Sequence, residues 1–128
     1  MIKIIFIAIG GAIGTLARYF VSGIDYKLSG GVFPVSTFII NSAGSLIIGF
    51  LWGLFERFTV SPTARMFIFI GILGGFTTFS TFALESFNLF RDGEFKIALA
   101  NILATNILGI VFVFVGFAVS RLLLNVAR

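Results

Sequence analysis

Charged residues divide this chain into long uncharged runs. Residues 28–55, 66–84 and 97–120 contain no charged side chain, and about 20 mostly apolar residues are enough for a helix to cross the hydrocarbon core of a membrane. A fourth run, residues 4–17, is shorter. It spans the membrane only if Arg18 lies inside the membrane or its side chain extends toward one surface. The pattern predicts four transmembrane helices at about residues 2–22, 33–55, 65–90 and 96–122, in a single domain over residues 1–128.

Short polar segments mark the ends of these helices. Pro34 and the Ser61–Pro62 pair are placed to begin helices two and three, because the first turn of a helix has no use for the N–H that proline lacks. Asp92–Gly93 is a turn dipeptide between helices three and four. The first run contains three glycines and no small-residue cleavage site follows it, so we expect a retained helix and not a signal peptide.

Composition supports an all-α membrane protein. The chain is 59% hydrophobic and 11% charged, whereas a soluble domain usually has about 25% charged residues. Histidine and cysteine are absent, which removes disulfides, thiol chemistry and the commonest metal ligands, and we expect no enzyme. The net charge of +4 comes from cations that flank apolar spans, so phospholipid headgroups are expected as partners and nucleic acid is not.

The cations are almost evenly divided between the two sides of the predicted membrane. One side carries both termini and the middle loop, with Lys3, Arg57, Arg65, Arg121 and Arg128. The other side carries Arg18, Lys27, Arg91 and Lys96. Lys and Arg in short loops set orientation, so two interpretations stay open. Either one extra cation fixes a single orientation, or the chain inserts both ways and pairs antiparallel with itself.

Four short helices enclose too little space for a pathway of their own, so we expect an oligomer. Two pairs of glycines with G-xxx-G spacing, Gly10 with Gly14 and Gly49 with Gly53, allow helix backbones to approach closely. For either pair taken singly, packing within one subunit is the favoured interpretation. The pairs do not identify the face that a second subunit would contact.

Polar residues recur one helical turn apart on two helices. Thr37, Asn41 and Ser45 share a face of helix two, and Asn101, Thr105 and Gly109 do the same on helix four. An asparagine inside a span needs a partner or water, and it serves either as a contact between helices or as the lining of a pathway. We interpret Asn41 as lining because its stripe is longer, leave both roles open for Asn101, and assign Asn106 to helix contacts.

The segment GGFTTFSTF at residues 74–82 interrupts the third apolar run. Gly71, Gly74 and Gly75 are expected to weaken the helix and to break it near residues 74–78, with Gly74 in a backbone conformation that a side chain would disfavour. At membrane depth such a break survives where it faces a cavity or an ion. Carbonyls freed in this way are good ligands for a small cation.

A helical projection beyond the break gathers hydroxyls, a carboxylate and two rings on one arc of about 160°. The residues of this arc are Thr78, Phe79, Thr81, Phe82, Glu85 and Ser86. Phe79 and Phe82 are three residues apart and are expected to stack along the helix. With 18 phenylalanines in the chain these rings are explained as core packing, but their positive edges also suit weak binding of a small anion.

The chain resembles the CrcB/Fluc fluoride channel family at this point. The resemblance rests on GGFTTFSTF, on Asn41 in helix two and on the Arg18–Tyr19 pair that ends helix one, and it covers the whole chain with the motifs in order. It implies an antiparallel, dual-topology homodimer in the cell membrane of a prokaryote, with two pores lined by both subunits. Some family members pair unlike subunits, so a paralogous partner is an alternative.

The resemblance also implies roles for individual residues. Phe79 and Phe82 would meet fluoride with their ring edges, Asn41 would be the pore asparagine, and Arg18 would lie at the pore vestibule. Further residues would supply a hydroxyl track beside the rings: Thr78, Ser80 and Thr81. The backbone carbonyls of Gly74 and Thr77, from both subunits, would hold a structural sodium ion at the dimer centre.

Two features depart from this assignment. Ser80 projects away from the arc, so it either lines the second pore or bonds back to the Phe76 carbonyl. Helix four has Asn101, Thr105 and Gly109 where relatives commonly have a tyrosine and serines.

The expected function is passive export of fluoride down its electrochemical gradient. A small dual-topology, proton-coupled exporter is the alternative, and it requires a carboxylate within the membrane, for which Glu85 is the candidate. A non-transporting assembly factor with four spans is a third possibility, and it leaves Asn41 and the broken helix unexplained.

Overall fold

The computed structural model describes residues 1–23 and 30–126. Its helices are, in order, α1 (Ile2–Ser22), α3 (Val35–Phe55), α4 (Pro62–Arg65), the π-helix η1 (Met66–Leu73), α5 (Gly74–Phe76), α6 (Phe79–Arg91) and α7 (Phe95–Val126). Within these residues, four stretches are long and apolar enough to cross a membrane: Ile2–Ser22, Val35–Phe55, Pro62–Arg91 and Phe95–Val126. The described residues contain no strand. The predicted all-α class with four spans is thus confirmed, while the antiparallel pairing of two copies stays a prediction.

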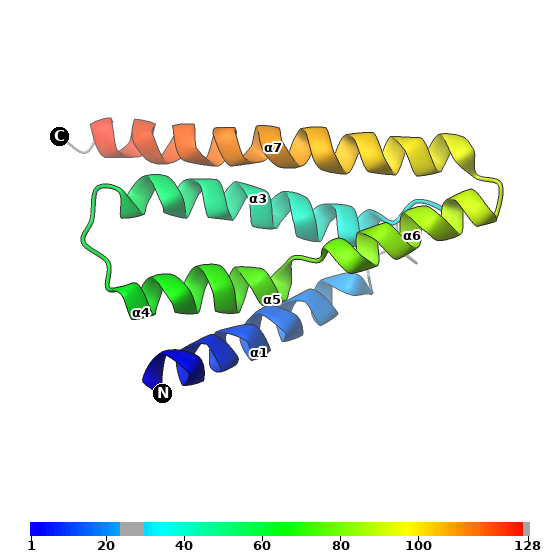
Figure 1. The fold of residues 1–128 in the computed structure, drawn as a ribbon. Coiled ribbons are helices and arrows are strands. Elements are labelled where there is room, and N and C mark those ends of the chain that lie inside the picture. Colours follow the sequence, from blue (N-terminus) through cyan, green and yellow to red (C-terminus); the bar gives the residue numbers. More distant parts are fainter. Residues whose placement is uncertain (24–29, 127–128) are drawn as a thin grey trace.

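The long helices lie side by side, and α3 runs between α7 and the segments of the third span (Figure 1). The N-terminal end of α1, the α3–α4 connection and the C-terminal end of α7 lie at one end of the molecule, and the α6–α7 turn lies at the other. The two ends of the molecule thus correspond to the two membrane sides between which the cations were counted. Lys27 and Arg128 of that balance lie outside the described residues.

Local signals begin and end the helices where the sequence predicted. Pro34 is the N-cap residue of α3. The Ser61 side chain accepts a hydrogen bond from the Ala64 N–H at 3.2 Å, and Pro62 is the first residue of α4. Gly93, in the turn before α7, has a φ of +80°, which glycine adopts without steric strain.

Two helix pairs are held together by close backbone contact. On the first pair, a Cβ added to Gly10 would lie 2.6 Å from the Phe67 carbonyl oxygen, so α1 approaches η1 as closely as backbones allow. On the second pair, a Cβ on Gly49 would overlap the Val113 carbonyl of α7. Both G-xxx-G pairs therefore pack within the chain, which confirms the interpretation favoured for each of them.

The break in the third span is real, but it is not made by the glycines. Residues 74–76 are helical, and Gly74 has φ −64° and ψ −36°, values that any residue adopts. The chain leaves the helix at Thr77 (ψ 159°) and Thr78 (φ −151°, ψ 122°). The expectation of a special conformation at Gly74 is thus wrong. Gly75 serves instead for close approach, because a Cβ there would lie 2.6 Å from the Gly11 carbonyl oxygen.

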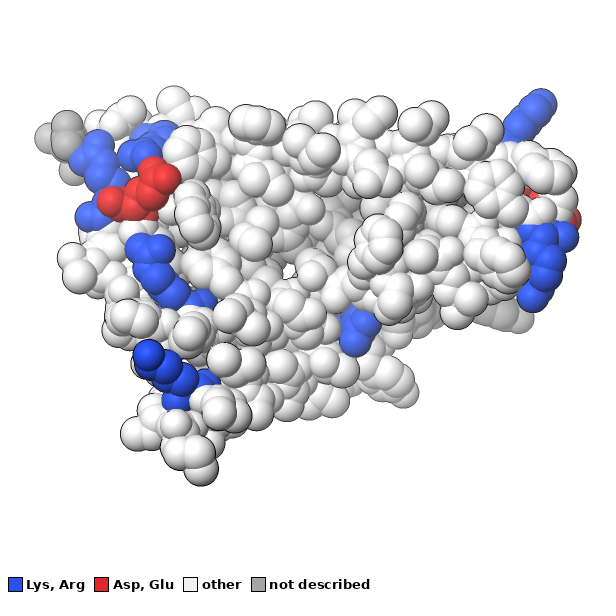
Figure 2. All heavy atoms as spheres, in the orientation of Figure 1, with Lys and Arg blue, Asp and Glu red and all other residues white. Residues whose placement is uncertain are grey.

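Charged side chains gather toward the two ends of the molecule, and on the face shown a broad middle band is nearly free of them (Figure 2). Large apolar side chains in the spans are exposed, including Phe114 at 70% and Ile110 at 62%. An apolar surface of this extent is rare on monomeric soluble proteins. This surface agrees with the four candidate membrane spans found in the described residues.

Candidate functional site

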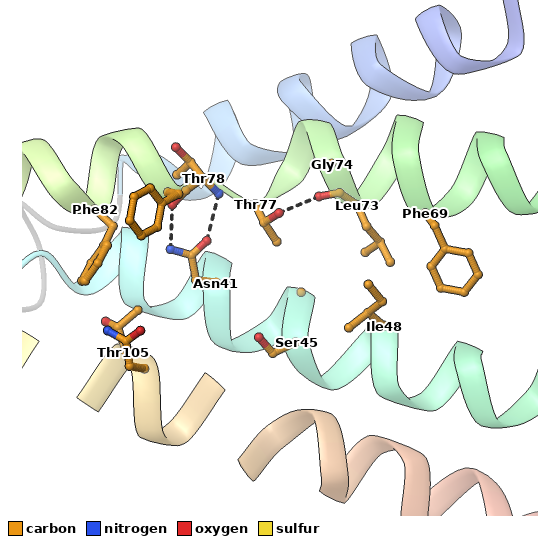
Figure 3. A pocket seen from close by; sticks show the side chains of 13 residues that line it. Asn41, Ser45, Ile48, Phe69, Leu73, Gly74, Thr77, Thr78, Phe82 and Thr105 are labelled. Carbon is orange, nitrogen blue, oxygen red and sulfur yellow. Dashed lines mark hydrogen bonds between the residues drawn. The ribbon is translucent and has the colours of Figure 1, made fainter. Parts of the chain in front are cut away.

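Asn41 of α3 closes the gap in the third span. A helix that stops leaves backbone N–H and C=O groups without partners, and lipid cannot supply them. The Asn41 Nδ2 donates to the Thr78 carbonyl at 2.9 Å, and the Thr78 N–H donates to the Asn41 Oδ1 at 2.9 Å. Figure 3 shows this pair of bonds beside the Thr77 hydroxyl, which donates to the Leu73 carbonyl at 2.8 Å. One amide thus replaces both lost bonds of a buried residue, since Thr78 is 8% exposed.

Thr78 also starts the next helix. Its Oγ1 accepts from the Thr81 N–H at 3.3 Å, which is the bond that an N-cap residue makes. Its hydroxyl in turn donates to the Thr81 Oγ1 at 3.0 Å. The break is therefore held from three directions, by α3, by the preceding helix and by its own cap.

An open groove of about 360 Å³ runs along α3 past this break. Figure 3 shows Phe82 and Thr105 toward one end of it and Ile48 and Phe69 toward the other. Its walls come from α3, the third span and α7: Asn41, Gly44, Ser45, Ile48, Phe69, Leu73, Gly74, Thr77, Thr78, Phe79, Phe82, Thr105 and Asn106. None of these residues is charged, so a small ion in the groove would meet amides, hydroxyls, backbone and rings.

Phe79 and Phe82 lie together in this groove, as the spacing predicted. Their ring centroids are 5.8 Å apart and the ring planes are inclined by 54°. The two rings differ in environment, because Phe82 is 7% exposed and Phe79 is 77% exposed. Phe82 is fixed by the packing of its own chain, whereas the Phe79 ring projects beyond it.

A second cavity, of about 280 Å³, lies on the other side of Thr78. It is lined by Arg18, Thr37 and Thr81, together with Thr15, Tyr19, Ser22, Ile40 and Thr78. The structure thus divides the expected site residues into two groups. Asn41, Phe79 and Phe82 line the groove, Arg18 and Thr81 line this second cavity, and Thr78 borders both.

The remaining members of the projected arc lie elsewhere. The Glu85 carboxylate accepts a hydrogen bond from the Thr37 hydroxyl at 2.7 Å, and the Ser86 hydroxyl donates to the Phe82 carbonyl at 2.8 Å. Ser80 is exposed and lines neither cavity. In the described part of the chain its hydroxyl makes no bond to the Phe76 carbonyl. The arc therefore does not face one cavity, because different neighbours cover its parts.

The asparagines of α7 have roles that spacing alone did not separate. Asn101 is 1% exposed, its Nδ2 donates to the Ser86 Oγ at 3.0 Å, and its Oδ1 accepts from the Thr105 hydroxyl at 3.3 Å. Of the two roles left open, Asn101 therefore has the helix-contact role. Asn106, expected to make helix contacts, is exposed and lines the groove, and its side chain bonds only to its own helix within the described chain, so its expected role stays a prediction. Thr105, which is on the predicted stripe, lines the groove as well.

Backbone carbonyls at the break have the chemistry of a site for a small cation. The oxygens of residues 74–77 lose their helical donors where the helix stops, because the Thr78 N–H turns to Asn41 and the Thr81 N–H to Thr78. Gly74 is exposed and lines the groove. Within the described ranges no group of three or more His, Cys, Asp or Glu side chains is placed to hold a metal ion. Carbonyl oxygens are hard ligands that suit sodium, so the Gly74 and Thr77 carbonyls fit the ion that the resemblance implied.

Comparison with known proteins agrees with this picture. A family model described as "CrcB-like protein, Camphor Resistance (CrcB)" matches residues 5–117. The chain is 42% identical over 128 residues to a protein of Parabacteroides distasonis, covering 100% of both chains. It is 45% identical over 122 residues to one of Geotalea daltonii (94% of this chain, 98% of the relative). It is 47% identical over 117 residues to one of Pyrococcus horikoshii (88% and 91%).

Each of these relatives is named fluoride-specific ion channel FluC. The family match and the alignments with the relatives extend over nearly the whole chain. They therefore include α1, the broken third span and α7. The chain belongs to the CrcB family.

Proposed function

We propose that this protein is a fluoride channel that lets the ion leave the cell passively. The observation that carries the proposal is the uncharged groove of about 360 Å³ at the break in the third span, where two phenylalanine rings lie beside amide and hydroxyl groups. The names of the relatives, all fluoride-specific ion channels, support the choice of ion. An interior-negative membrane potential drives an anion outward, so no energy source is needed.

The groove suits a small anion that must pass without being trapped. Phenylalanine rings have positive edges, and Phe79 and Phe82 bring two such rings to the groove. Asn41 and Thr78 add neutral dipoles beside the rings. Full positive charge in the groove would hold the anion too tightly, whereas weak binding at several sites permits conduction. Arg18, in the neighbouring cavity, raises the local anion concentration without lining the groove.

The open groove supports an assembly of two chains. The Phe79 ring is 77% exposed and the Ser80 hydroxyl lies on the outside of the chain, at a depth where lipid would be an unfavourable neighbour for the hydroxyl. A second copy placed against this face encloses the groove and brings Ser80 to a pathway of the pair. We propose an antiparallel homodimer, in accordance with the nearly even cation balance, with a paralogous chain as the alternative partner.

A structural sodium ion is part of this proposal. The Gly74 and Thr77 carbonyls would hold it, and its charge would stabilise oxygen dipoles that otherwise lack donors. Its place in the assembly is the contact between the two copies. We place the assembly in the cell membrane of a prokaryote, with lipid around the four spans.

Fluoride release from liposomes tests the function. Liposomes with the unmodified protein should release fluoride when a potassium ionophore sets the membrane potential. Collapse of a pH gradient should leave this release unchanged, whereas it would stop release by a proton-coupled exporter. Phe79→Ile and Phe82→Ile should assemble, since a hydrophobic swap of this kind costs about 1 kcal/mol, yet release fluoride at least about tenfold more slowly, equivalent to about 1.4 kcal/mol of added barrier.

The matched control is Phe87→Ile. Phe87 is on the same helix and 59% exposed, and it lines neither cavity, so its replacement should leave release normal. Absence of fluoride release by the unmodified protein would contradict the channel. Normal release by well-assembled Phe79→Ile and Phe82→Ile proteins would contradict the role of the rings.

A further inference from the structure

Asn106 presents an amide to the groove from α7. The residue is exposed and lines the groove with Thr105. Its Nδ2 donates one hydrogen bond, to the Ile102 carbonyl of its own helix at 2.7 Å. An amide nitrogen carries two hydrogens, so one N–H remains. In the described part of the chain neither this N–H nor the Oδ1 has a partner.

The other polar side chains around the groove are mostly engaged. The Asn41 amide binds both backbone groups of Thr78, and the Thr77 hydroxyl donates to the Leu73 carbonyl. On α7, the Thr105 hydroxyl donates to Asn101, so it is not available to an ion. The Ser45 hydroxyl, on α3, is another donor at the groove without a partner among the described residues.

We infer that Asn106 donates its remaining N–H to the anion in the groove and is the contribution of α7 to the pathway. The inference rests on the proposed function and adds a residue to it. An amide in the middle of an apolar span is unfavourable against lipid, so its exposure points to an ion, to water or to another chain. The groove brings it to the same space as the Phe79 and Phe82 rings. A neutral donor in that space binds an anion weakly enough to release it.

Two substitutions with opposite steric effects test the inference. Asn106→Leu removes the donor and adds bulk, and Asn106→Ala removes the donor and leaves space. If the N–H contacts fluoride, both proteins should assemble as the unmodified protein does and release fluoride about tenfold more slowly, which corresponds to about 1.4 kcal/mol. Asn106→Ser keeps a neutral donor and should recover most of the rate. Leu103→Ala is the matched control, because Leu103 is on α7, 57% exposed and outside the groove.

Each outcome decides between the alternatives. Slow release by both donor-free proteins, with recovery in Asn106→Ser, supports the inference. Normal release by assembled Asn106→Ala overturns it, and slow release by Asn106→Leu alone would then report bulk. Loss of assembly in both proteins overturns it as well, because the amide would then be a contact between subunits. If the unmodified protein releases no fluoride, the channel function fails first and the inference with it.

Discussion

Replacing Asn41 with leucine should destabilise the protein at the break. Two hydrogen bonds of 2.9 Å are lost, and the N–H and C=O of Thr78 keep no partner. Thr78 is 8% exposed, so solvent does not readily replace the amide. A buried group left unsatisfied costs about 1–3 kcal/mol in soluble proteins, and interhelical bonds in a membrane protein average about 0.6 kcal/mol. For two bonds between these limits, we expect the free energy of unfolding to fall by about 1–6 kcal/mol.

Reversible unfolding in mixed detergent micelles measures this change, and amide hydrogen exchange at Thr78 locates it. The control is Asn106→Leu, which also exchanges an amide for an apolar side chain but removes one bond within a single helix. It should change the free energy of unfolding by less than about 0.5 kcal/mol. If Asn41→Leu unfolds like the unmodified protein and the exchange of the Thr78 N–H is unchanged, Asn41 does not hold the break.

Three further results are expected. Gly75→Val should prevent folding, because its Cβ would lie 2.6 Å from the Gly11 carbonyl oxygen. Gly74→Ala should unfold like the unmodified single chain, because the nearest contact of its Cβ is at 3.7 Å. Thermal unfolding in detergent compares the two variants. Asn101→Leu should lower the unfolding free energy by about 1 kcal/mol through the lost bond to Ser86, and an unchanged transition would contradict its contact role. Two lysines added after residue 128 should force one orientation and reduce fluoride release, and co-expression with an oppositely biased variant should restore it; full release by the forced form alone would refute antiparallel pairing.

The four helices were predictable because they follow from solvent and from local chemistry. A charge-free run of about 20 residues has few alternatives to a transmembrane helix. Pro34, Ser61–Pro62 and Asp92–Gly93 act within one or two turns of where they stand, so their effects do not depend on the rest of the fold.

The position of the break was less predictable because glycine has two uses. In a helix interior it costs about 1 kcal/mol relative to alanine, which packing readily offsets. Gly75 allows α1 to approach and stays helical. The signal that could have located the break is the pair Thr77–Thr78, in which Thr78 is spaced to cap the N–H of Thr81. The π-helix Met66–Leu73 had no recognised signal in the sequence.

The site was predictable in its residue types and less so in its grouping. A helical projection gives the direction of a side chain from one axis, but it does not say which neighbour fills the space there. Thr81 and Phe82 are adjacent on the projected arc, yet Thr81 lines the cavity with Arg18 and Phe82 lines the groove. On α7 both Thr105 and Asn106 line the groove, although the spacing placed only Thr105 on the polar stripe.

The pairing of α3 with α7 has a consequence for how the protein is made. Synthesis proceeds from the N-terminus, so α3 enters the membrane well before its partner has left the ribosome. Until then Gly49 and Gly53, which fit against Val113 and Ser120 of α7, have no matching surface within the nascent chain. The first half of the third span can meet α1 meanwhile, because both have already been synthesised. A chain that stops before α7 keeps an uncovered glycine face in the bilayer, so the last helix to be inserted is the one that completes the fold.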